Sequence, residues 1–354
     1  MKKLYLLLLA TLFAVSISAQ QQLAVLDHND TLTVYYGADA LNSANTAAVN
    51  GDIITLTGGT YNTPNEISKA ITIRGAGMYA DTANGTLPTI VTGTVRVTFN
   101  GTASSHTSLE GIRFSGDLVA GKGQTTWYTY NISHLSVSKC YINSLYVHDA
   151  YNKQYFLVNS TFIDCIIYNM DYRTNYPWYA CYGTIKTTDF INCVILNMQN
   201  SDVTGLYNSL TNCVAKMPPS DVANFTINNS ILFYNTGTPS SSSNVFNSIG
   251  INTSGNNTYF DTTITNGQNL HNYSSLTDIF QDFNGSYSYG FTTFRLNPSI
   301  SNLTGSDGTQ IGIYGGPAPF EPSVRNVLIG KLNVGRRTNA QGKLEVNVDI
   351  IEAQ

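Results

Sequence analysis

Apolar and polar residues alternate over short segments of this chain, and clusters of Asn, Thr, Ser and Gly separate the segments. The pattern is clearest in FINCVILNM at 190–198, and it returns in FIDCIIYNM at 162–170 and LTNCVAKM at 210–217. A period of two residues is typical of a β-strand with one buried face, and no helical period runs through these segments. The pattern therefore predicts short strands that recur along the chain.

The recurring segments share a register, which becomes visible when they are aligned on the cysteine. The aligned positions are Cys140, Cys165, Cys193, Cys213, Ser230 and Ser248, at intervals of 25, 28, 20, 17 and 18 residues. Three positions earlier every repeat has an apolar residue, namely Val137, Phe162, Phe190, Leu210, Ile227 and Val245. The residues two positions later are Ile142, Ile167, Ile195, Ala215, Leu232 and Gly250. An interval of about 20 residues with variable insertions is typical of a solenoid, in which each repeat is one coil stacked on the last.

A polar residue, most often asparagine, stands directly before each aligned cysteine or serine. These residues are Lys139, Asp164, Asn192, Asn212, Asn229 and Asn247. Asparagine tolerates the left-handed conformation that a sharp corner demands, so we expect a corner here in every repeat. Asparagines at the same corner of consecutive coils can hydrogen-bond along the axis, which predicts an asparagine ladder.

The cysteines of the repeat are expected to be buried free thiols. A small residue just after the corner points into a narrow core, where Cys and Ser both fit. Equivalent side chains in adjacent coils run parallel about 4.8 Å apart, whereas a disulfide needs Cβ atoms about 3.8 Å apart. Cys181 lies outside the register, in an aromatic segment, where an exposed thiol is expected.

The chain divides into four parts on this interpretation. Residues 1–19 have the charged start, 14-residue apolar core and small-residue cleavage site of a signal peptide. In the N-terminal segment 20–50, residues 38–50 predict a short amphipathic helix that covers the open first coil. Residues 51–320 supply roughly ten coils. In 321–354, VLIGKLNV and KLEVNVDI alternate around NAQG and predict a C-terminal β-hairpin, which either caps the last coil or serves as a tail module for attachment.

The start of the coil region resembles a known family. GDIITLTGGTYN at 51–62, KAITIRGAG at 69–77 and LEGIRFSG at 109–116 resemble the first coils of pectin-lyase-like proteins, which include polysaccharide lyases of the chondroitinase B and alginate lyase type. SDGTQIGIYGGPAPF at 306–320 resembles the closing segment of many exported proteins of this type. The resemblance implies an all-β fold, a single-stranded right-handed parallel β-helix, and a function on polysaccharides.

The amino-acid composition limits the classes of partner and the cellular locations that we expect for the protein. Only 11% of the residues are charged and the formal net charge is −4, which argues against nucleic acid as a partner. The apolar core of the leader is shorter than the ~20 residues of a membrane span and contains no cysteine for lipid attachment. We therefore expect a protein that is secreted, periplasmic or on the cell surface, without a membrane span. The sequence predicts no oligomeric state.

Lyases of this family use a basic residue to remove a proton beside a uronic carboxylate, often with Ca²⁺ held by acidic side chains. The only comparable set on consecutive repeats is Lys139, Asp164, Lys186 and Asp189, and Ca²⁺ is expected only if the chain is such a lyase. Lys139 and Asp164 also occupy the corner position, which by itself explains them. A glycoside hydrolase, which needs paired carboxylates, ranks behind the lyase because no close Asp pair stands out.

Aromatic residues concentrate in two insertions between strands. TTWYTYN at 125–131 and YNMDYRTNYPWYACYG at 168–183 contain both tryptophans of the protein. Tyr and Trp on a projecting loop suit stacking on sugar rings, and an arginine beside them suits hydroxyls or a carboxylate. The predicted glycan-binding residues are Trp127, Tyr128, Tyr130, Tyr172, Arg173, Tyr176, Trp178 and Tyr179. The alternative is that these aromatics fold back onto the coils and only pack there.

Overall fold

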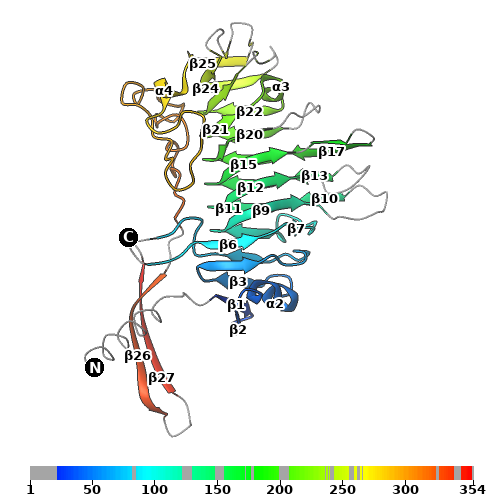
Figure 1. Cartoon of the computed structure of the whole chain (residues 1–354), viewed down its shortest axis with the longest axis vertical. Helices are drawn as coiled ribbons and strands as arrows, with labels where there is room; N and C mark the ends of the chain where they lie inside the picture. Colours follow the sequence, from blue (N-terminus) through cyan, green and yellow to red (C-terminus); the bar gives the residue numbers. More distant parts are fainter. Residues whose placement is uncertain are drawn as a thin grey trace, which may run out of the picture.

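One large, mostly parallel sheet of 21 strands dominates the molecule, and its strands are stacked along the long axis (Figure 1). The structure is a computed structural model, and it describes residues 22–81, 85–121, 130–147, 155–171, 173–176, 179–198, 207–235, 237, 239, 243–254, 259–260, 264, 266–323, 327–338 and 344–352. The expected signal peptide at 1–19 lies outside these residues. The described helices are short and strands make up most of the regular structure, so the chain is mainly β.

The stack begins with an antiparallel hairpin that the sequence pattern did not predict. Strands β1 (Leu23–His28) and β2 (Thr31–Tyr36) pair with each other, and β1 also pairs antiparallel with β3 (Ile53–Leu56). The predicted helix is confirmed as α2 (Ala40–Ala47), which buries Ala40, Leu41 and Ala44. Because Ala40 and Ala44 are small, the helix approaches closely, and α2 covers the first strands of the stack.

Two columns of parallel strands follow, joined by a corner in each repeat. The first column consists of β3, β5 (Thr72–Arg74), β8 (Thr107–Glu110), β11 (Leu135–Ser138), β14 (Thr161–Ile163), β18 (Asp189–Ile191), β20 (Asn208–Thr211), β22 (Phe225–Asn228) and the start of β24 (Asn244–Asn252). The second consists of β4 (Gly59–Asn62), β6 (Thr89–Thr92), β9 (Arg113–Ala120), β12 (Tyr141–Tyr146), β15 (Ile166–Asp171), β19 (Val194–Ile195), β21 (Val214–Lys216), β23 (Ile231–Tyr234) and the end of β24. Strand β7 (Val95–Val97) pairs with β9, and β25 (Asn266–Tyr273) pairs with β24 at the far end.

The predicted register is confirmed at every aligned position. Phe162 lies between Val137 and Phe190 on neighbouring strands, and the series continues through Leu210, Ile227 and Val245. The series that starts at Ile142 is in register in the same way, through Gly250. Both series are buried throughout, so the alternation in the sequence marks the inward face.

The predicted corners are also confirmed. Lys139, Asp164, Asn192, Asn212, Asn229 and Asn247 all have φ between 47° and 54°. The small residue after each corner points inward, and its side chain can accept a hydrogen bond from the equivalent N–H of the preceding repeat. Cys213 N–H donates to Ser230 Oγ at 3.0 Å, and Ser230 N–H donates to Ser248 Oγ at 3.1 Å. This accounts for small polar residues at a position where the chain turns into the core.

A second corner of the same kind was not predicted. His134, Asn159, Thr187 and Tyr207 have φ between 47° and 58°, and the residue after each is buried. The hydrogen bonds follow the same rule here, since Leu135 N–H donates to Ser160 Oγ at 3.1 Å. Residue types vary too much at this corner for an alignment on cysteine to reveal it.

The cysteines of the repeat are free and buried, as predicted: Cys140, Cys165, Cys193 and Cys213. Each thiol donates to main-chain carbonyls, for example from Cys213 Sγ to Thr211 O at 3.3 Å. Burial raises the pKa of the Cys140, Cys165 and Cys193 thiols well above its usual range. The side chain of Cys181 lies outside the described part of the chain.

Asparagine stacking is present, but it is divided among several columns. Asn269 Nδ2 donates to Asn247 Oδ1 at 3.1 Å in the predicted column, and Asn266 Nδ2 donates to Asn244 Oδ1 at 2.9 Å in another. Further along the predicted column, Asn229 Oδ1 instead accepts a hydrogen bond from Ser306 N–H at 3.0 Å. The corner asparagines therefore also hold a later segment of the chain.

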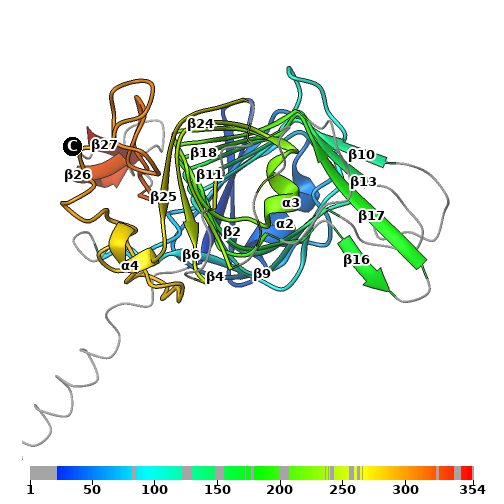
Figure 2. The ribbon, with the colours of Figure 1, turned by 90° about the horizontal axis from the view of Figure 1, so that it is seen from above.

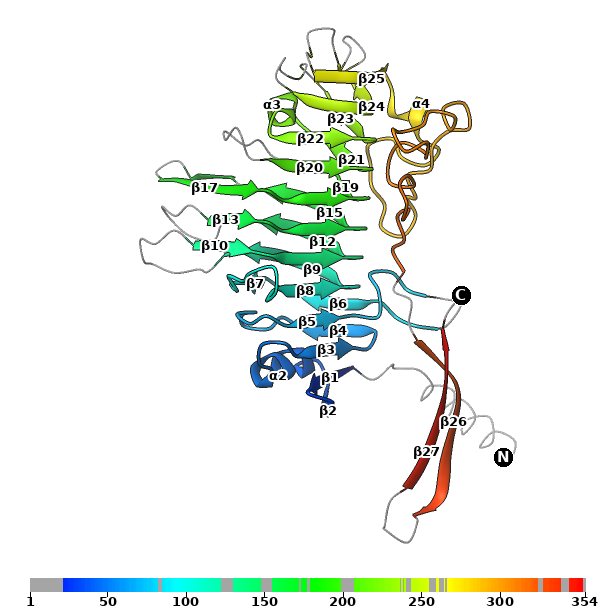
Figure 3. The ribbon, with the colours of Figure 1, turned by 180° about the vertical axis from the view of Figure 1, so that it is seen from behind.

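That later segment, residues 274–320, packs against the outside of the second column (Figure 3). It contains α4 (Leu276–Ile279) and otherwise has little regular structure, so the last strand of the large sheet is β25. Its apolar residues, among them Phe280, Phe283 and Phe294, form a second core with outward residues such as Val214 and Ile231. Both faces of these strands are therefore buried.

The predicted C-terminal hairpin is confirmed as β26 (Val327–Thr338) and β27 (Leu344–Glu352), which pair antiparallel in a sheet of their own. In Figures 1 and 3 the hairpin projects away from the last repeats, at the end of the stack where β1 and β2 lie. This position fits a tail module better than a cap on the last repeat.

Candidate functional site

Lys139 and Asp164 occupy neighbouring positions at the predicted corner, where they hold residues 321–323, which follow the segment 274–320. Lys139 N–H donates to Ile163 O at 2.9 Å, and Lys139 Nζ donates to Ser323 O at 2.9 Å. The backbone N–H of Glu321 donates to the Asp164 carboxylate. Both side chains are thus engaged with the segment that leads to the C-terminal hairpin.

Asp164 is an electrostatically unfavourable residue in this position. Its side chain is buried, and Oδ1 has no hydrogen-bond partner among the described residues. Burial raises the pKa of Asp164 from 3.8 to about 6, against the opposing effects of Lys139 and the Glu321 N–H. A carboxylate there lies beneath residues 321–323, where a polymeric substrate has no access.

Lys186 and Asp189 lie at the other corner of the repeat and are exposed. Lys186 ends β17 (Tyr179–Lys186), in register with Val158, and Asp189 begins β18. Asp189 Oδ1 accepts a hydrogen bond from Ser209 Oγ at 2.5 Å. Since β18 separates these residues from the corner at Asn192, the four candidate catalytic residues form two separate pairs.

The aromatic insertion at 168–183 extends from the stack as strands. β16 (Arg173–Tyr176) and β17 form an antiparallel hairpin in which Tyr176 is in register with Tyr179, and Arg173 with Tyr182. β17 continues a parallel row with β13 (Tyr155–Val158) and β10 (Tyr130–Ser133), where Tyr130 is in register with Tyr155. Figure 2 shows this row on the side of the stack opposite the segment 274–320. Trp127, Tyr128, Tyr172 and Trp178 lie outside the described residues.

Where the segment 274–320 meets the second column lies an aromatic cluster that the sequence reasoning missed, and we call it the tyrosine–arginine cluster. It consists of Tyr79, Arg113, Tyr141, Tyr168, Tyr287 and Tyr289, contributed by three neighbouring strands, the turn after β5 and the segment 274–320. The Tyr141 and Tyr289 rings meet edge to face at 5.1 Å, and the Tyr79 and Tyr287 hydroxyls are 3.2 Å apart. Tyr168 is 40% exposed, so the cluster reaches the surface.

Arg113 is the cation of this cluster. Its guanidinium carbon lies 3.7 Å from the centre of the Tyr289 ring and 5.7 Å from that of Tyr141, both cation–π distances. Arg113 Nε is buried without a hydrogen-bond partner, and among the described residues no carboxylate lies within 4.0 Å of the side chain. Among the described residues, its charge therefore faces aromatic rings and no acid.

The four buried tyrosines Tyr79, Tyr141, Tyr287 and Tyr289 remain neutral phenols at physiological pH. Burial raises the pKa of Tyr289 to about 12, and it also raises the pKa of Tyr79, Tyr141 and Tyr287. Tyr289 donates its hydroxyl proton to the carbonyl of Met78, which orients the ring beneath Arg113. The cluster is thus a fixed apolar platform with hydroxyl tips and one positive charge.

A row of asparagines borders the cluster on β12, on β15 and just after β19. Tyr168 is adjacent to Asn169 on β15; Asn197 Nδ2 donates to Asn169 Oδ1 at 3.0 Å, and Asn169 Nδ2 approaches Asn143 O at 3.4 Å. All three asparagines are partly exposed. Amide groups in a row beside aromatic rings are suited to hydrogen-bonding sugar hydroxyls.

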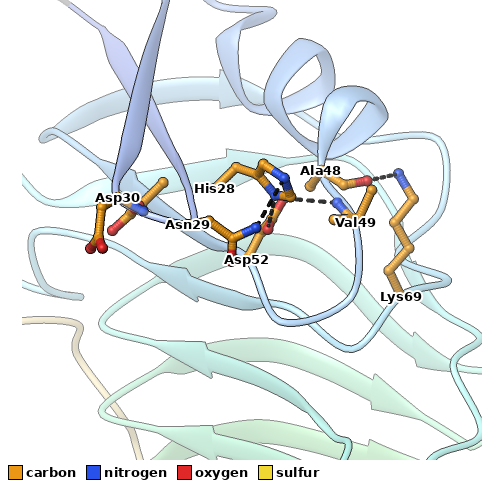
Figure 4. Close-up of polar contacts among 8 residues, drawn as sticks. His28, Asn29, Asp30, Ala48, Val49, Asp52 and Lys69 are labelled. Carbon is orange, nitrogen blue, oxygen red and sulfur yellow. Dashed lines mark hydrogen bonds and ion pairs between the residues drawn. The ribbon is translucent and has the colours of Figure 1, made fainter.

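A polar group near the first strands is structural (Figure 4). His28 Nδ1 lies 2.8 Å from Asp52 Oδ1, and Val49 N–H donates to Asp52 Oδ2 at 2.8 Å. Lys69 Nζ donates to Ala48 O at 2.6 Å and to two carbonyls in the last turn of α2, which caps the helix. Burial raises the pKa of Asp52, but the Val49 N–H and His28 outweigh it and hold the pKa below its usual value. These contacts fix the helix to β3.

Two further observations concern the part of the chain that the structure describes. No three or more His, Cys, Asp or Glu side chains are placed there to hold a metal ion. None of its helices combines the length and apolarity needed to cross a membrane. The sequence matches no protein-family model and no curated protein.

The sequence contains a signal for the tyrosine–arginine cluster at one outward-facing position of the repeat. Arg113 and Tyr141 are in register with Ile166, at the first strand position after the corner. Later repeats have Val194, Val214 and Ile231 at this position, all buried by the segment 274–320. Arginine and tyrosine at this otherwise aliphatic position mark the repeats where the aliphatic packing against the segment 274–320 gives way to the tyrosine–arginine cluster.

Proposed function

We propose that this is an exported protein built as a right-handed parallel β-helix of the pectin-lyase-like kind. The support is the pairing of β11, β14, β18, β20 and β22 with the equivalent strand one repeat later, at intervals of 17 to 28 residues, with two left-handed corners in a repeat. A single chain that stacks two columns of parallel strands in this way has the connectivity of a solenoid. The resemblance at 51–116 agrees with this assignment.

We further propose that the protein binds a glycan on the outer face of β9, β12 and β15. The observation that carries this proposal is Arg113 stacked on Tyr289 without a carboxylate partner among the described residues, beside the exposed ring of Tyr168. Aromatic faces stack on sugar rings, and the asparagine row at 143, 169 and 197 offers amides to the hydroxyls. The hairpin β16–β17, whose sequence is rich in tyrosine, follows β15 at its other end.

The glycan is expected to be acidic. A guanidinium whose charge no nearby acid neutralises binds a carboxylate or sulfate through charge-assisted hydrogen bonds, which are about twice as strong as neutral ones. A uronic-acid polysaccharide supplies both the charge and the ring faces. Ring stacking alone does not distinguish acidic from neutral sugars, so Arg113 is the residue that sets this preference.

A polysaccharide lyase remains the alternative function, with Ca²⁺ as its expected cofactor. It would need Lys139, Asp164, Lys186 and Asp189 to act together on one substrate. Lys139 and Asp164 are bound to residues 321–323, and the other two lie at a different corner. For this reason we favour binding without catalysis.

Calorimetric titration of the purified protein with uronic-acid polysaccharides and neutral glucans tests the proposal. Tyr168→Ala and Arg113→Met are each expected to weaken binding to the acidic polymer at least tenfold, about 1.4 kcal/mol. Tyr207→Ala removes a ring that is 78% exposed in another repeat and should leave the affinity unchanged. Thermal melting of each variant separates lost binding from lost folding.

The outcomes separate the alternatives. Binding of acidic polymers that both cluster variants weaken supports the proposal, whereas equal affinity for neutral glucans removes Arg113 as the selectivity residue. In a parallel absorbance assay on the same polymers, growth of the unsaturated-uronate signal that Lys139→Ala abolishes would make the protein a lyase. Absence of binding to every polymer contradicts the glycan proposal.

A further inference from the structure

The first edge of the large sheet is open and apolar. β2 pairs only with β1 among the described strands, and its side chains Leu32, Val34 and Tyr36 are 64%, 41% and 65% exposed. They lie on one face with the partly exposed Leu23 and Val25 of β1, which are in register with Tyr36 and Val34. An exposed edge strand with apolar side chains is normally protected by charges, proline or a bulge, and TLTVYY contains none of these.

The unpaired backbone groups of β2 follow from the geometry of its hairpin. Asn29 and Asp30 both have positive φ, which makes a two-residue turn in which His28 and Thr31 form a hydrogen-bonded pair. In an antiparallel pair such residues alternate along the strand, so Thr33 and Tyr35 also bond to β1. The N–H and C=O groups of Leu32, Val34 and Tyr36 therefore point to the open edge.

We propose that this edge binds the same edge of a second copy of the chain, antiparallel about a twofold axis at Val34. This register places Val34 opposite Val34 of the second copy and Leu32 opposite Tyr36, so that every outward-pointing backbone group finds a partner. Three hydrogen-bonded pairs with two bonds each give about six new bonds. The same register places apolar side chains opposite apolar side chains on one face.

The β2 edge of a second copy is a better partner for this edge than the β25 end of a second copy. The strand carries no charge, so two copies do not repel each other at the axis. A twofold contact uses identical surfaces and closes at a dimer. The opposite end of the stack is formed by β25, where Asn266, Gln268 and Asn269 are exposed. Contact between the two unlike ends would therefore pair an apolar strand with a polar one. It would also build open chains of molecules instead of a closed dimer.

Light scattering coupled to size exclusion measures the mass of the purified protein over a range of concentrations. We expect a dimer for the wild type. Val34→Lys, which places two lysines opposite each other at the axis, should weaken dimerisation at least tenfold. Thr55→Lys is the matched control, since Thr55 is exposed on β3 and lies outside the proposed pair, and it should remain a dimer.

Oxidative cross-linking tests the register. Val34→Cys should form an intermolecular disulfide, because Cα atoms of a hydrogen-bonded pair lie about 5.5 Å apart, within disulfide range. Leu32→Cys alone should not, since its partner is Tyr36, but a mixture of Leu32→Cys and Tyr36→Cys should. A wild-type monomer at all concentrations overturns the proposal, as does a dimer that Val34→Lys leaves intact or growth beyond the dimer.

Discussion

Replacing Asp164 with asparagine should stabilise the protein at neutral pH. Burial raises the pKa of Asp164 from 3.8 to about 6, so at pH 7 the folded protein holds a carboxylate in a place that favours the neutral acid. Asn192, Asn212 and Asn229 occupy the same corner in the next repeats with φ near that of Asp164. The variant Asp164→Asn would thus keep the corner, remove the charge and give a donor at the position of the unpartnered Oδ1.

The size of the effect follows from the two pKa values. A tenfold change in an acid dissociation constant corresponds to about 1.4 kcal/mol, so the rise from 3.8 to about 6 destabilises the ionised form by at most about 3 kcal/mol. Because the folded pKa is the higher one, the wild type is most stable below the unfolded pKa and loses stability as the pH rises through 6. We expect Asp164→Asn to be about 1–3 kcal/mol more stable than the wild type at pH 7 and no more stable at pH 4.

Urea denaturation at pH 4, 5, 6, 7 and 8 measures this difference. Asp189→Asn is the matched control, since it makes the same change at an exposed position one repeat away and should shift stability by less than about 0.5 kcal/mol. A pH-independent difference between Asp164→Asn and the wild type, or a less stable variant at pH 7, would refute the electrostatic reasoning.

Other predictions test the corners, the thiols and the first strands. Asn229→Ala should cost about 2–3 kcal/mol in urea denaturation, because alanine resists the left-handed conformation and the bond to Ser306 is lost, and Asn229→Gly should cost less. Cys213→Ser should change stability by less than about 1 kcal/mol, since serine fills this position in later repeats. In the native protein at most one of five thiols should react with Ellman's reagent, that of Cys181, and all five should react after unfolding. The stabilising contribution of Asp52, measured against Asp52→Asn, should be present above about pH 4 and vanish as the pH falls through its lowered pKa.

Much of the strand stacking could be predicted because the inward positions repeat. A slip of one residue would turn Phe162 and Phe190 to the outside, so the apolar alternation specifies the register. The left-handed corner was predictable for a similar reason, since asparagine is among the few residues that adopt it readily. The second corner has His134, Asn159, Thr187 and Tyr207, and no single residue type reveals it.

The candidate site was less accessible to sequence reasoning. Tyr287 and Tyr289 lie in a segment without repeats, and their partners Tyr79 and Tyr141 stand far away in the sequence. No local pattern predicts which outward positions such a segment covers. The projecting aromatic insertion was predictable from the 28-residue interval alone, because an insertion between stacked strands has to leave the stack.

The direct test of the binding surface is hydroxyl-radical footprinting of the protein with and without the acidic polysaccharide that it binds most tightly. We expect the glycan to reduce oxidation of Tyr168, the exposed ring of the tyrosine–arginine cluster, while Tyr207 in a later repeat is oxidised equally in both samples. Unchanged oxidation of Tyr168 under saturating glycan would contradict the account.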